Sequence, residues 1–495
     1  MERADRRPAE RPPIDLSNLP DCVADVAACA AEPDRGAADL ESYAALRAAV
    51  DAARGRLPAL YRRAVVLPFG AALDRLGPAG LRRLLASDPS REGAALVLLD
   101  VARAIAQSGA DPAVDAFQEV VTDLYDGFLS AEDRRGVKPP DRGVVPPLVE
   151  FGRPDFGPYT LPIEAVAALG VEAGVVSLPP ATARRGLCLW AALGHETAGH
   201  DVLSADTGLE AELAAAIRAA LGRAGPAWLA GYWSDRIGET ASDVLGILNM
   251  GPAAAVGLVA TFRGLGAAWG SGPRLRGEGP AEDPHPADLV RAFLAAATVR
   301  LLESSSREGW AAAIDAEADR DGGRIVLAGR ELGAAEARRS AALVAEVLVR
   351  APLRSLEGHA LGAIQGWRDA DEEIVARLRA ALEGGGDLAG EAGPGTYAAH
   401  AVAAAVVAAA AGGAPARLLG RLLLLLGAMH RADPVWSGLD VAHPGDLRRR
   451  PATTLRPAPA RPLTPRGAPP GPARGPRRST RRSGPTRGSA RRRGR

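Results

Sequence analysis

The residues with the clearest capacity for chemistry lie in "GHETAGHDVL", residues 194–203. His195 and His200 could bind a metal ion, and Glu196 could take a proton from a water molecule beside it. In an ideal α-helix, residues five apart differ by about 140° in direction and by about 7.5 Å in height. A regular helix would therefore point the two imidazoles away from each other.

A π-bulge would bring the two histidines back together. Such a bulge widens one helical turn to admit one extra residue, and bulges of this kind concentrate at functional sites. Gly199 precedes the second histidine, where it could accept the altered backbone without a side-chain clash. The spacing therefore predicts a local π-helix near Gly199, with both imidazoles facing one metal ion.

A third ligand is expected in "GETASDVL", residues 238–245. Catalytic zinc usually has three protein ligands and one open position for water. Glu239 and Asp243 are four residues apart and so share one face of a helix. We expect Glu239 to complete the site for a single Zn²⁺ ion, and Asp243 to accept a hydrogen bond from a ligand histidine.

These motifs resemble those of a known family. "HETAGH" resembles the HExxGH signature of the dipeptidyl peptidase III metallopeptidases, and "GETASD" resembles the downstream ligand segment of that family. The resemblance implies zinc ligands His195, His200 and Glu239, with Glu196 as general base and Asp243 supporting a histidine. The arrangement is also similar to gluzincins, in which a strand, an HExxH helix and a later glutamate helix build the site.

The resemblance is limited to residues 194–243. The second motif of the family begins with two adjacent glutamates, whereas the first of these positions is Gly238 here. The match therefore supports a metal site better than any particular substrate. Alone, the HExxxH pattern is also compatible with two ordinary helix histidines.

Two further side chains could stabilise the oxyanion of a tetrahedral intermediate. His285 lies in "EDPHPADLVRAF", where its prolines could hold it facing a cleft, and Tyr232 precedes Glu239 by seven residues. Asp283 and Pro286 are also typical of the start of a helix, which is the alternative interpretation of this segment. Cys188 precedes His195 by seven residues, and we interpret it as a core residue.

Hydrophobic periodicity predicts a mainly α-helical fold. The resemblance to gluzincins implies a multi-helical zincin-like metalloprotease domain with a short edge strand or small sheet before the active-site helix. The helices expected after the motif span 209–223, 226–248, 252–267, 286–304, 335–350 and 370–383, followed by a hairpin broken at "GGAP". "VEAGVVSLPP" predicts a short strand before the histidine helix, and "GRIVLAG" a weaker second one. The segment 176–180 could be an edge strand that pairs with an extended peptide, or an ordinary connecting strand.

Composition divides the chain into regions. We expect a disordered N-terminus at 1–18, a helical region at 19–133, a metal-binding catalytic core at 134–270, a second helical region at 271–446 and a disordered tail at 447–495. The tail carries 16 arginines and no acid follows Asp446, which leaves residues 1–447 with a net charge near −15. Such a tail could bind a polyanion weakly and without sequence specificity.

The segment 1–20 has charges and prolines where an export signal would be apolar, and Cys22, Cys29 and Cys188 form no thiolate motif. We therefore expect a cytoplasmic protein without a membrane span. The sequence favours a zinc-dependent hydrolase, most specifically a metallopeptidase acting on peptides. The alternative is a non-catalytic helical scaffold that binds nucleic acid or another polyanion through its tail.

Overall fold

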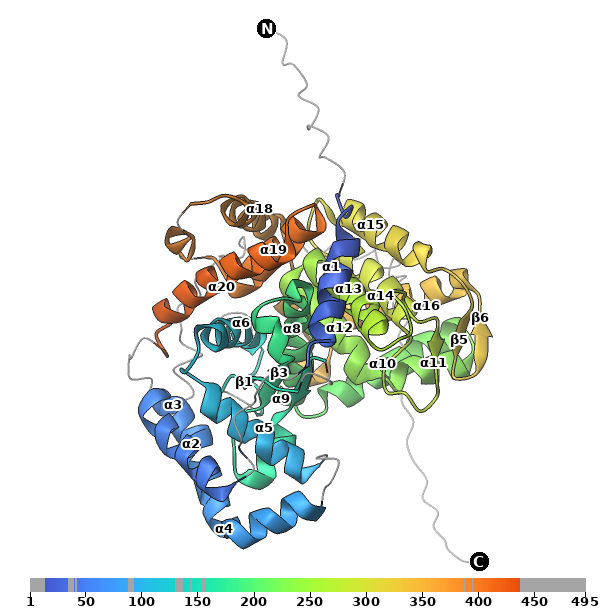
Figure 1. The fold of residues 1–495 in the computed structure, drawn as a ribbon. Helices are drawn as coiled ribbons and strands as arrows, with labels where there is room; N and C mark the ends of the chain where they lie inside the picture. The colour runs from blue at the N-terminus through green and yellow to red at the C-terminus, as the bar shows by residue number, and fades with distance from the viewer. Residues whose placement is uncertain are drawn as a thin grey trace, which may run out of the picture. The chain divides into compact units, whose positions relative to one another are not determined.

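The computed structural model describes residues 14–33, 40, 42–87, 93–129, 137–142, 145–153, 157–386, 388–393 and 395–436. All of them belong to one compact unit, Met1–Leu455, while the second unit, Arg456–Arg495, lies outside the described residues. The described residues are mainly helical, as predicted (Figure 1). The predicted division into regions stays a prediction, and the arginine tail at 447–495 lies outside the described part.

The first third of the chain is helical and leads into a small sheet. Its helices are α1 (Leu19–Ala30), α2 (Tyr43–Arg56), α3 (Ala59–Tyr61), the π-helix η1 (Arg62–Val66), α4 (Leu67–Ser87), α5 (Ala94–Gln107) and α6 (Pro112–Leu129). The segments that follow are β1 (Leu148–Phe151), β2 (Tyr159–Leu161), α7 (Ile163–Val166), η2 (Ala167–Leu169), β3 (Val175–Leu178) and η3 (Pro180–Ala183).

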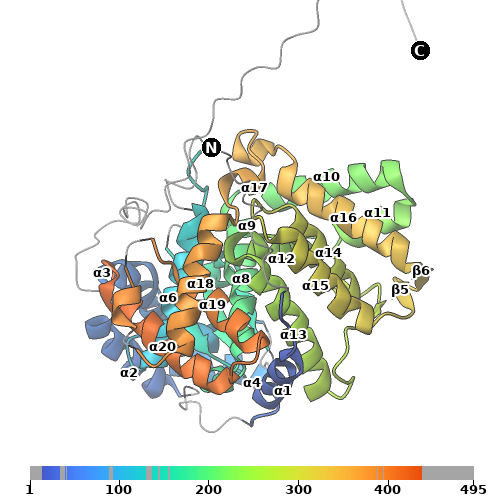
Figure 2. The same ribbon diagram turned by 90° about the horizontal axis from the view of Figure 1, so that it is seen from above.

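The predicted metal motif lies on the next elements. These are η4 (Leu187–Ala192), α8 (Leu193–His195), η5 (Glu196–Asp201), α9 (Val202–Ala205), α10 (Leu209–Ala224), α11 (Ala227–Ser234), α12 (Ile237–Met250) and α13 (Pro252–Ala268). The helix predicted at 226–248 is therefore two helices, α11 and α12. Both views of the ribbon place α8 and α12 side by side in the interior of the unit (Figures 1 and 2).

The rest of the described chain is again helical around a second small sheet. It comprises β4 (Glu278–Gly279), α14 (Asp288–Arg300), α15 (Arg307–Arg320), β5 (Ile325–Leu327), β6 (Arg330–Leu332), α16 (Ala334–Arg350), η6 (Arg354–Leu356), α17 (Leu361–Ile364), α18 (Asp369–Glu383), η7 (Ala389–Glu391), α19 (Ala398–Ala410) and α20 (Pro415–Ala432). The strand predicted at 323–329 is β5, and the hairpin broken at "GGAP" is α19 and α20. Among the described residues, no helix is long and apolar enough to cross a bilayer.

The first sheet has the strand order β1-β3-β2, with β1 parallel and β2 antiparallel to β3. The strand predicted before the histidine helix therefore exists as β3, but it is the central strand. The expectation that 176–180 forms an edge strand is wrong, because β1 and β2 occupy its two sides. Strand β2, for which the sequence predicted no element, is the edge strand that packs against η5.

Both faces of this sheet are covered. Leu148 and Val175 belong to a hydrophobic cluster with α2, α4 and α5, whereas Val149 and Val176 belong to the main core around α12 and α13. Alternate residues of a strand point to opposite faces. The strands of this sheet are short, but helices pack on both of its faces and bury its apolar side chains.

Candidate metal centre

The helix that carries the two histidines contains the predicted π-helix. Residues Glu196–Asp201 form η5 between the α-helical segments α8 and α9. The wider turn brings Nε2 of His200 to 3.2 Å from Nε2 of His195. The one extra residue in HExxxH is therefore absorbed by the helix itself, and the two imidazoles face one point.

Gly199 has a role in this helix that differs from the one expected. Its backbone is helical, so it relieves no conformational strain. A Cβ atom at Gly199 would instead lie 2.3 Å from Cβ and 2.5 Å from Cα of Ser242 on α12. Glycine is required at this position because the two helices cross too closely for any side chain.

A second glycine contact continues the same crossing. A Cβ atom on Gly246 of α12 would lie 2.9 Å from the carbonyl carbon of Gly194. Together, Gly194 and Gly199 flank His195 and bring its helix against α12 at two points. The sequence did not predict this close helix crossing, although a glycine directly before each histidine, Gly194 before His195 and Gly199 before His200, was a usable signal.

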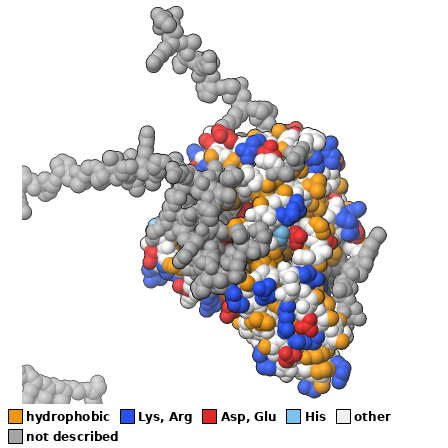
Figure 3. Space-filling model, turned by 90° about the vertical axis from the view of Figure 1, so that its left-hand side faces the viewer, with side chains coloured by type: hydrophobic (Ala, Val, Ile, Leu, Met, Phe, Trp, Pro, Cys, Tyr) orange, Lys and Arg blue, Asp and Glu red, His pale blue; other side chains and the backbone are white. Residues whose placement is uncertain are grey.

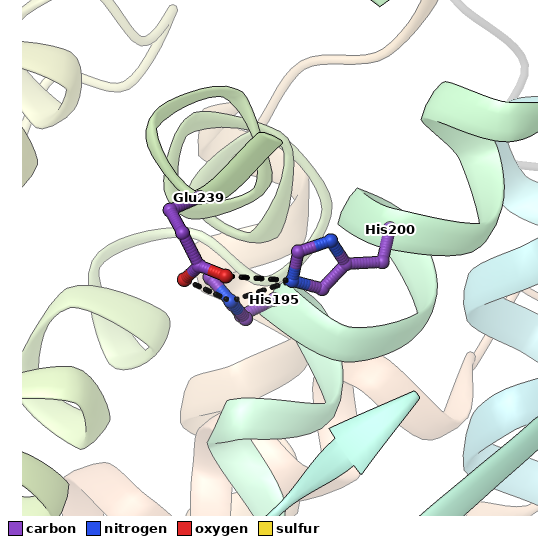
Figure 4. Close-up of side chains that lie close together, drawn as sticks. All are labelled: His195, His200 and Glu239. Atoms are coloured by element: carbon purple, nitrogen blue, oxygen red, sulfur yellow. Dashed lines mark hydrogen bonds and ion pairs between the residues drawn. The ribbon is translucent and has the colours of Figure 1, made fainter. Parts of the chain in front are cut away.

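The third predicted ligand joins the two histidines. Glu239, in the first turn of α12, has Oε2 at 3.3 Å from Nε2 of His195 and Oε1 at 3.4 Å from Nε2 of His200 (Figure 4). These three residues form a group of side chains able to hold a metal ion. Figure 4 shows the three side chains converging from two helices.

The dimensions of this triangle fit zinc. Tetrahedral zinc with bonds of about 2.0–2.1 Å requires ligand atoms that lie about 3.3–3.4 Å apart. The two imidazole nitrogens are 3.2 Å apart, close to that requirement, and each of them lies 3.3 or 3.4 Å from a different carboxylate oxygen of Glu239. The residues present could therefore hold a zinc ion with little rearrangement, and the identity of the metal stays a proposal.

Asp243 lies one turn beyond Glu239, as its spacing predicts. Its Oδ1 lies 2.8 Å from Nδ1 of His195, so it can accept a hydrogen bond that leaves Nε2 of the ring for a metal. Burial opposes the charge of His195, but the hydrogen bonds with Asp243 and Glu239 raise its pKa to about 10. Without a metal, the ring is therefore held as a cation between two carboxylates.

Arg291 on α14 is a member of the site that the sequence did not indicate. Its Nε donates to Oδ2 of Asp243 at 2.7 Å and its Nη2 donates to Oδ1 at 2.8 Å. Both side chains are buried, and Nη2 also lies 3.5 Å from Oε2 of Glu239. Burial acts to raise the pKa of Asp243, but Arg291 outweighs it and the pKa is lowered.

Glu196, the predicted general base, is nearly buried beside the metal group. The hydroxyl of Thr160 on β2 lies 2.9 Å from its Oε2 and 3.1 Å from its backbone oxygen, and we assign the single proton to the nearer acceptor, the carboxylate. Thr160 pairs with Val176 in the sheet and points to the face that carries η5. The edge strand therefore fixes the direction of the carboxylate, which no sequence signal indicated.

His285 also reaches the site, although it lies in the loop before α14 and not in the helix itself. Its Nε2 is 3.6 Å from Oε1 of Glu239, and its Nδ1 is 3.0 Å from Oδ1 of Asp283. Half of its side chain is exposed. Asp283 therefore orients the ring with Nε2 toward the metal group.

The other candidates are placed away from the chemistry. The hydroxyl of Tyr232 accepts a hydrogen bond from the backbone nitrogen of Ala287 at 2.9 Å, which directs it into the wall of this loop. A contact with Cys22, together with burial, raises the pKa of the Cys188 thiol well above its usual value. Cys188 is therefore a core residue, as interpreted from the sequence.

A cleft of about 1190 Å³ opens over the metal group. Its lining includes His195, Glu196, His200, Glu239, His285 and Arg291. A space of this size admits a substrate larger than a single amino acid. The five predicted side chains that touch the cleft are thus brought together at its floor, with Asp243 behind them.

Comparison of the chain with known protein families, with curated proteins and with solved structures gives no match. The resemblance of residues 194–243 to zinc peptidases is thus carried by the motifs alone. The geometry of the site is the basis for a functional assignment.

Proposed function

We propose that this protein is a zinc-dependent hydrolase and, more specifically, a metallopeptidase. The observation that carries the proposal is the triangle of His195, His200 and Glu239, whose potential ligand atoms lie within 4.8 Å of one another in a large cleft. Among the described residues, three protein ligands converge, and a site with three protein ligands has a position open for water, as catalytic zinc requires. Glu196 beside this triangle supplies the acid–base group that a scaffold protein would not need.

The residues of the chain would divide the chemistry among them. Bound zinc would supply Lewis acidity, which polarises a carbonyl group and acidifies water. Glu196, oriented by Thr160, would take the proton from the attacking water and deliver it to the leaving amine. His285, held by Asp283, would donate a hydrogen bond to the developing oxyanion when both ring nitrogens carry protons, since Nδ1 already faces Asp283.

The supporting residues would keep this geometry fixed. Asp243 accepts from His195 and selects the tautomer in which Nε2 is available to the metal. Arg291 holds Asp243 in turn. Strand β2 has one edge beside β3 and lies next to η5, a position in which an extended peptide could pair with it.

Metal analysis of purified variants tests the proposal. We expect stoichiometric zinc in the wild type and in Glu196→Gln, and its loss in His200→Ala. A matched control is His359→Ala, because His359 is bonded to a backbone carbonyl outside the site and should not affect zinc. Glu196→Gln should lower cleavage of a mixed peptide library by about 100-fold or more.

Two outcomes would separate the parts of the proposal. A wild type purified without chelator that neither contains nor binds zinc would refute the metal site. A zinc-loaded protein that leaves every peptide of the library intact would refute peptidase activity, and the hydrolase would then act on another class of substrate.

A further inference from the structure

An apolar strip runs along the face of α13 that borders the cleft. Leu258, Phe262, Leu265 and Trp269 are spaced by four, three and four residues, so they share one helix face, and all four line the cleft. Trp269 is 57% exposed, one of few large hydrophobic side chains so open among the described residues. Exposed apolar area of this kind marks a binding surface.

The strip begins beside the metal group. Helix α13 packs on the segment before His195, where a Cβ on Gly257 would lie 2.3 Å from Cβ of Ala191. Farther along, the Arg291 guanidinium lies 4.5 Å from the centre of the Phe262 ring. Because Arg291 also binds Asp243, Phe262 touches the network that supports the metal ligands.

Strand β2 and its flanking residues form another wall of the cleft. At one end, Gly157 faces the strip, since a Cβ there would lie 3.7 Å from Leu265 and 3.8 Å from Trp269. In the middle, Thr160 binds the carboxylate of Glu196. At the other end, Glu164 pairs with Arg142. The apolar strip therefore lies at one end of β2 and the Arg142–Glu164 pair at the other.

The charged end is largely neutralised by its own pairs. Arg142 is paired with Glu164, and Lys138 lies 3.0 Å from Asp206. A charged ligand would have to compete with these contacts, whereas an apolar ligand on the strip displaces only water. Glu210 also lines the cleft, and the ion pairs among the described residues do not include it, so it is a rival site for a cationic group.

We propose that the α13 strip is the specificity subsite and receives a large apolar side chain, aromatic or leucine-like, of a residue flanking the scissile bond. This inference rests on the proposed function, because it places the reacting group at the metal. The substrates would be peptides selected by one apolar residue and not by charge. The occupant is the substrate itself, since the strip is continuous with the metal group.

Hydroxamates test this subsite without requiring hydrolysis, because they anchor on zinc. The experiment measures the affinity of the zinc-loaded full chain for acetohydroxamate and 3-phenylpropanohydroxamate by calorimetry. We expect the phenyl compound to bind at least about tenfold more tightly, as burial of an aromatic side chain requires. In Leu265→Ala and in Trp269→Ala, this ratio should fall at least about threefold.

The matched control is Leu424→Ala, which removes a leucine that is 66% exposed on α20, away from the cleft, and should leave the ratio unchanged. Equal affinity for the two hydroxamates, or a ratio that both strip variants leave intact, would overturn the inference while the metal site stands. The inference would also be overturned if an amine-bearing hydroxamate bound more tightly than the phenyl compound and Glu210→Gln abolished that preference. Apolar selectivity without peptide cleavage would support the subsite and refute the peptidase, and failure to bind zinc would refute both.

Discussion

Arg291 and Asp243 form a buried ion pair directly behind the metal ligands. Neither charge is exposed to water, and each would be costly to bury alone. The guanidinium lowers the pKa of Asp243, so the carboxylate stays ionised and able to accept from His195. Arg291 therefore supports the metal centre through Asp243, although it is not itself a ligand.

Replacement of Arg291 by methionine should be strongly destabilising. It would leave Asp243 buried without its partner, a change that costs about 3–5 kcal/mol in comparable pairs. We expect a lower free energy of unfolding in urea and weaker zinc binding by calorimetry. Arg354→Met is a matched control, since Arg354 is 93% exposed in its pair with Glu212 and should change neither quantity much. Unchanged zinc affinity in Arg291→Met would contradict this role.

Thr160→Val should separate catalysis from binding. The variant keeps the shape of the side chain but removes the hydroxyl that donates to Glu196. We expect kcat to fall about tenfold with KM and zinc content nearly unchanged, because the carboxylate would lose its orientation and not its contact with substrate. Steady-state kinetics on a cleaved peptide measure this, and a fall confined to 1/KM would show that Thr160 binds substrate instead.

At the scale of elements, the π-helix η5 and its crossing with α12 form the centre. Gly199→Ala should destabilise the protein by at least about 1–3 kcal/mol and weaken zinc binding, because the added Cβ would meet backbone and side-chain atoms of Ser242. Gly222→Ala on α10 is the control, since its Cβ would meet no atom within 4 Å and should be neutral or stabilising. Urea unfolding and zinc titration compare the two. Full zinc affinity in Gly199→Ala would mean that the crossing can loosen freely.

The other face of β2 carries a buried acid cluster that makes stability depend on pH. The hydroxyl of Tyr159 and the guanidinium of Arg103 both contact Asp100 and Glu150. Burial, with the nearby charge of Asp100, raises the pKa of Glu150 to about 8. One tyrosine hydroxyl proton cannot serve two carboxylates, so a protonated Glu150 completes the network.

Glu150→Gln should flatten the pH dependence of stability. The unfolded chain releases the Glu150 proton near pH 4–5, whereas the folded chain retains it until about pH 8. The stabilisation is therefore complete below pH 4 and is lost as pH rises toward 8, with a slope of at most about 1.4 kcal/mol per pH unit. The difference in unfolding free energy between wild type and Glu150→Gln at pH 5, 6.5 and 8 measures this. Parallel curves would refute the buried proton.

Local sequence patterns predicted the helices that carry the metal ligands. Strands β1 and β2 and the position of Arg291 depend on tertiary packing and could not be predicted in this way. The five-residue spacing of His195 and His200 required a π-helix, and the four-residue spacing of Glu239 and Asp243 put both on one face. Strands β1 and β2 lie between prolines and are only four and three residues long. Segments this short show no clear alternation of apolar and polar residues. Arg291 lies 96 residues from His195, and only the tertiary fold brings the two together.

For the whole molecule, bound zinc should act as a cross-link between distant segments. The ligands come from η5 with its flanking α8 and from α12, and α12 in turn packs against α10, α13, α14 and α19. At a free zinc concentration 1,000 times the Kd, binding stabilises the folded state by about 4 kcal/mol, or about 5 °C in Tm for a chain of this size. Thermal unfolding with and without chelator measures the shift, which His200→Ala should abolish and His359→Ala should retain.

The charge of the described surface bears on the alternative function. On the face drawn in Figure 3, basic and acidic side chains are interspersed wherever grey atoms do not cover them. That face offers no broad basic patch for a polyanion among the residues described. The alternative function assigns polyanion binding to the arginine tail at 447–495, which lies outside the described residues.

The extra residue of the π-helix also bears on how this motif could change during evolution. Deleting Ala198 would leave "HETGH", the ordinary spacing, in which a regular α-helix already aligns the two imidazoles. The deletion would remove the wide turn that absorbs the extra residue, so the residues after His200 would keep their direction and the change would be confined to the backbone between the two histidines. That stretch includes Gly199, a position at which α12 leaves no room for a Cβ atom. A shortened motif is therefore expected to keep glycine immediately before the second histidine.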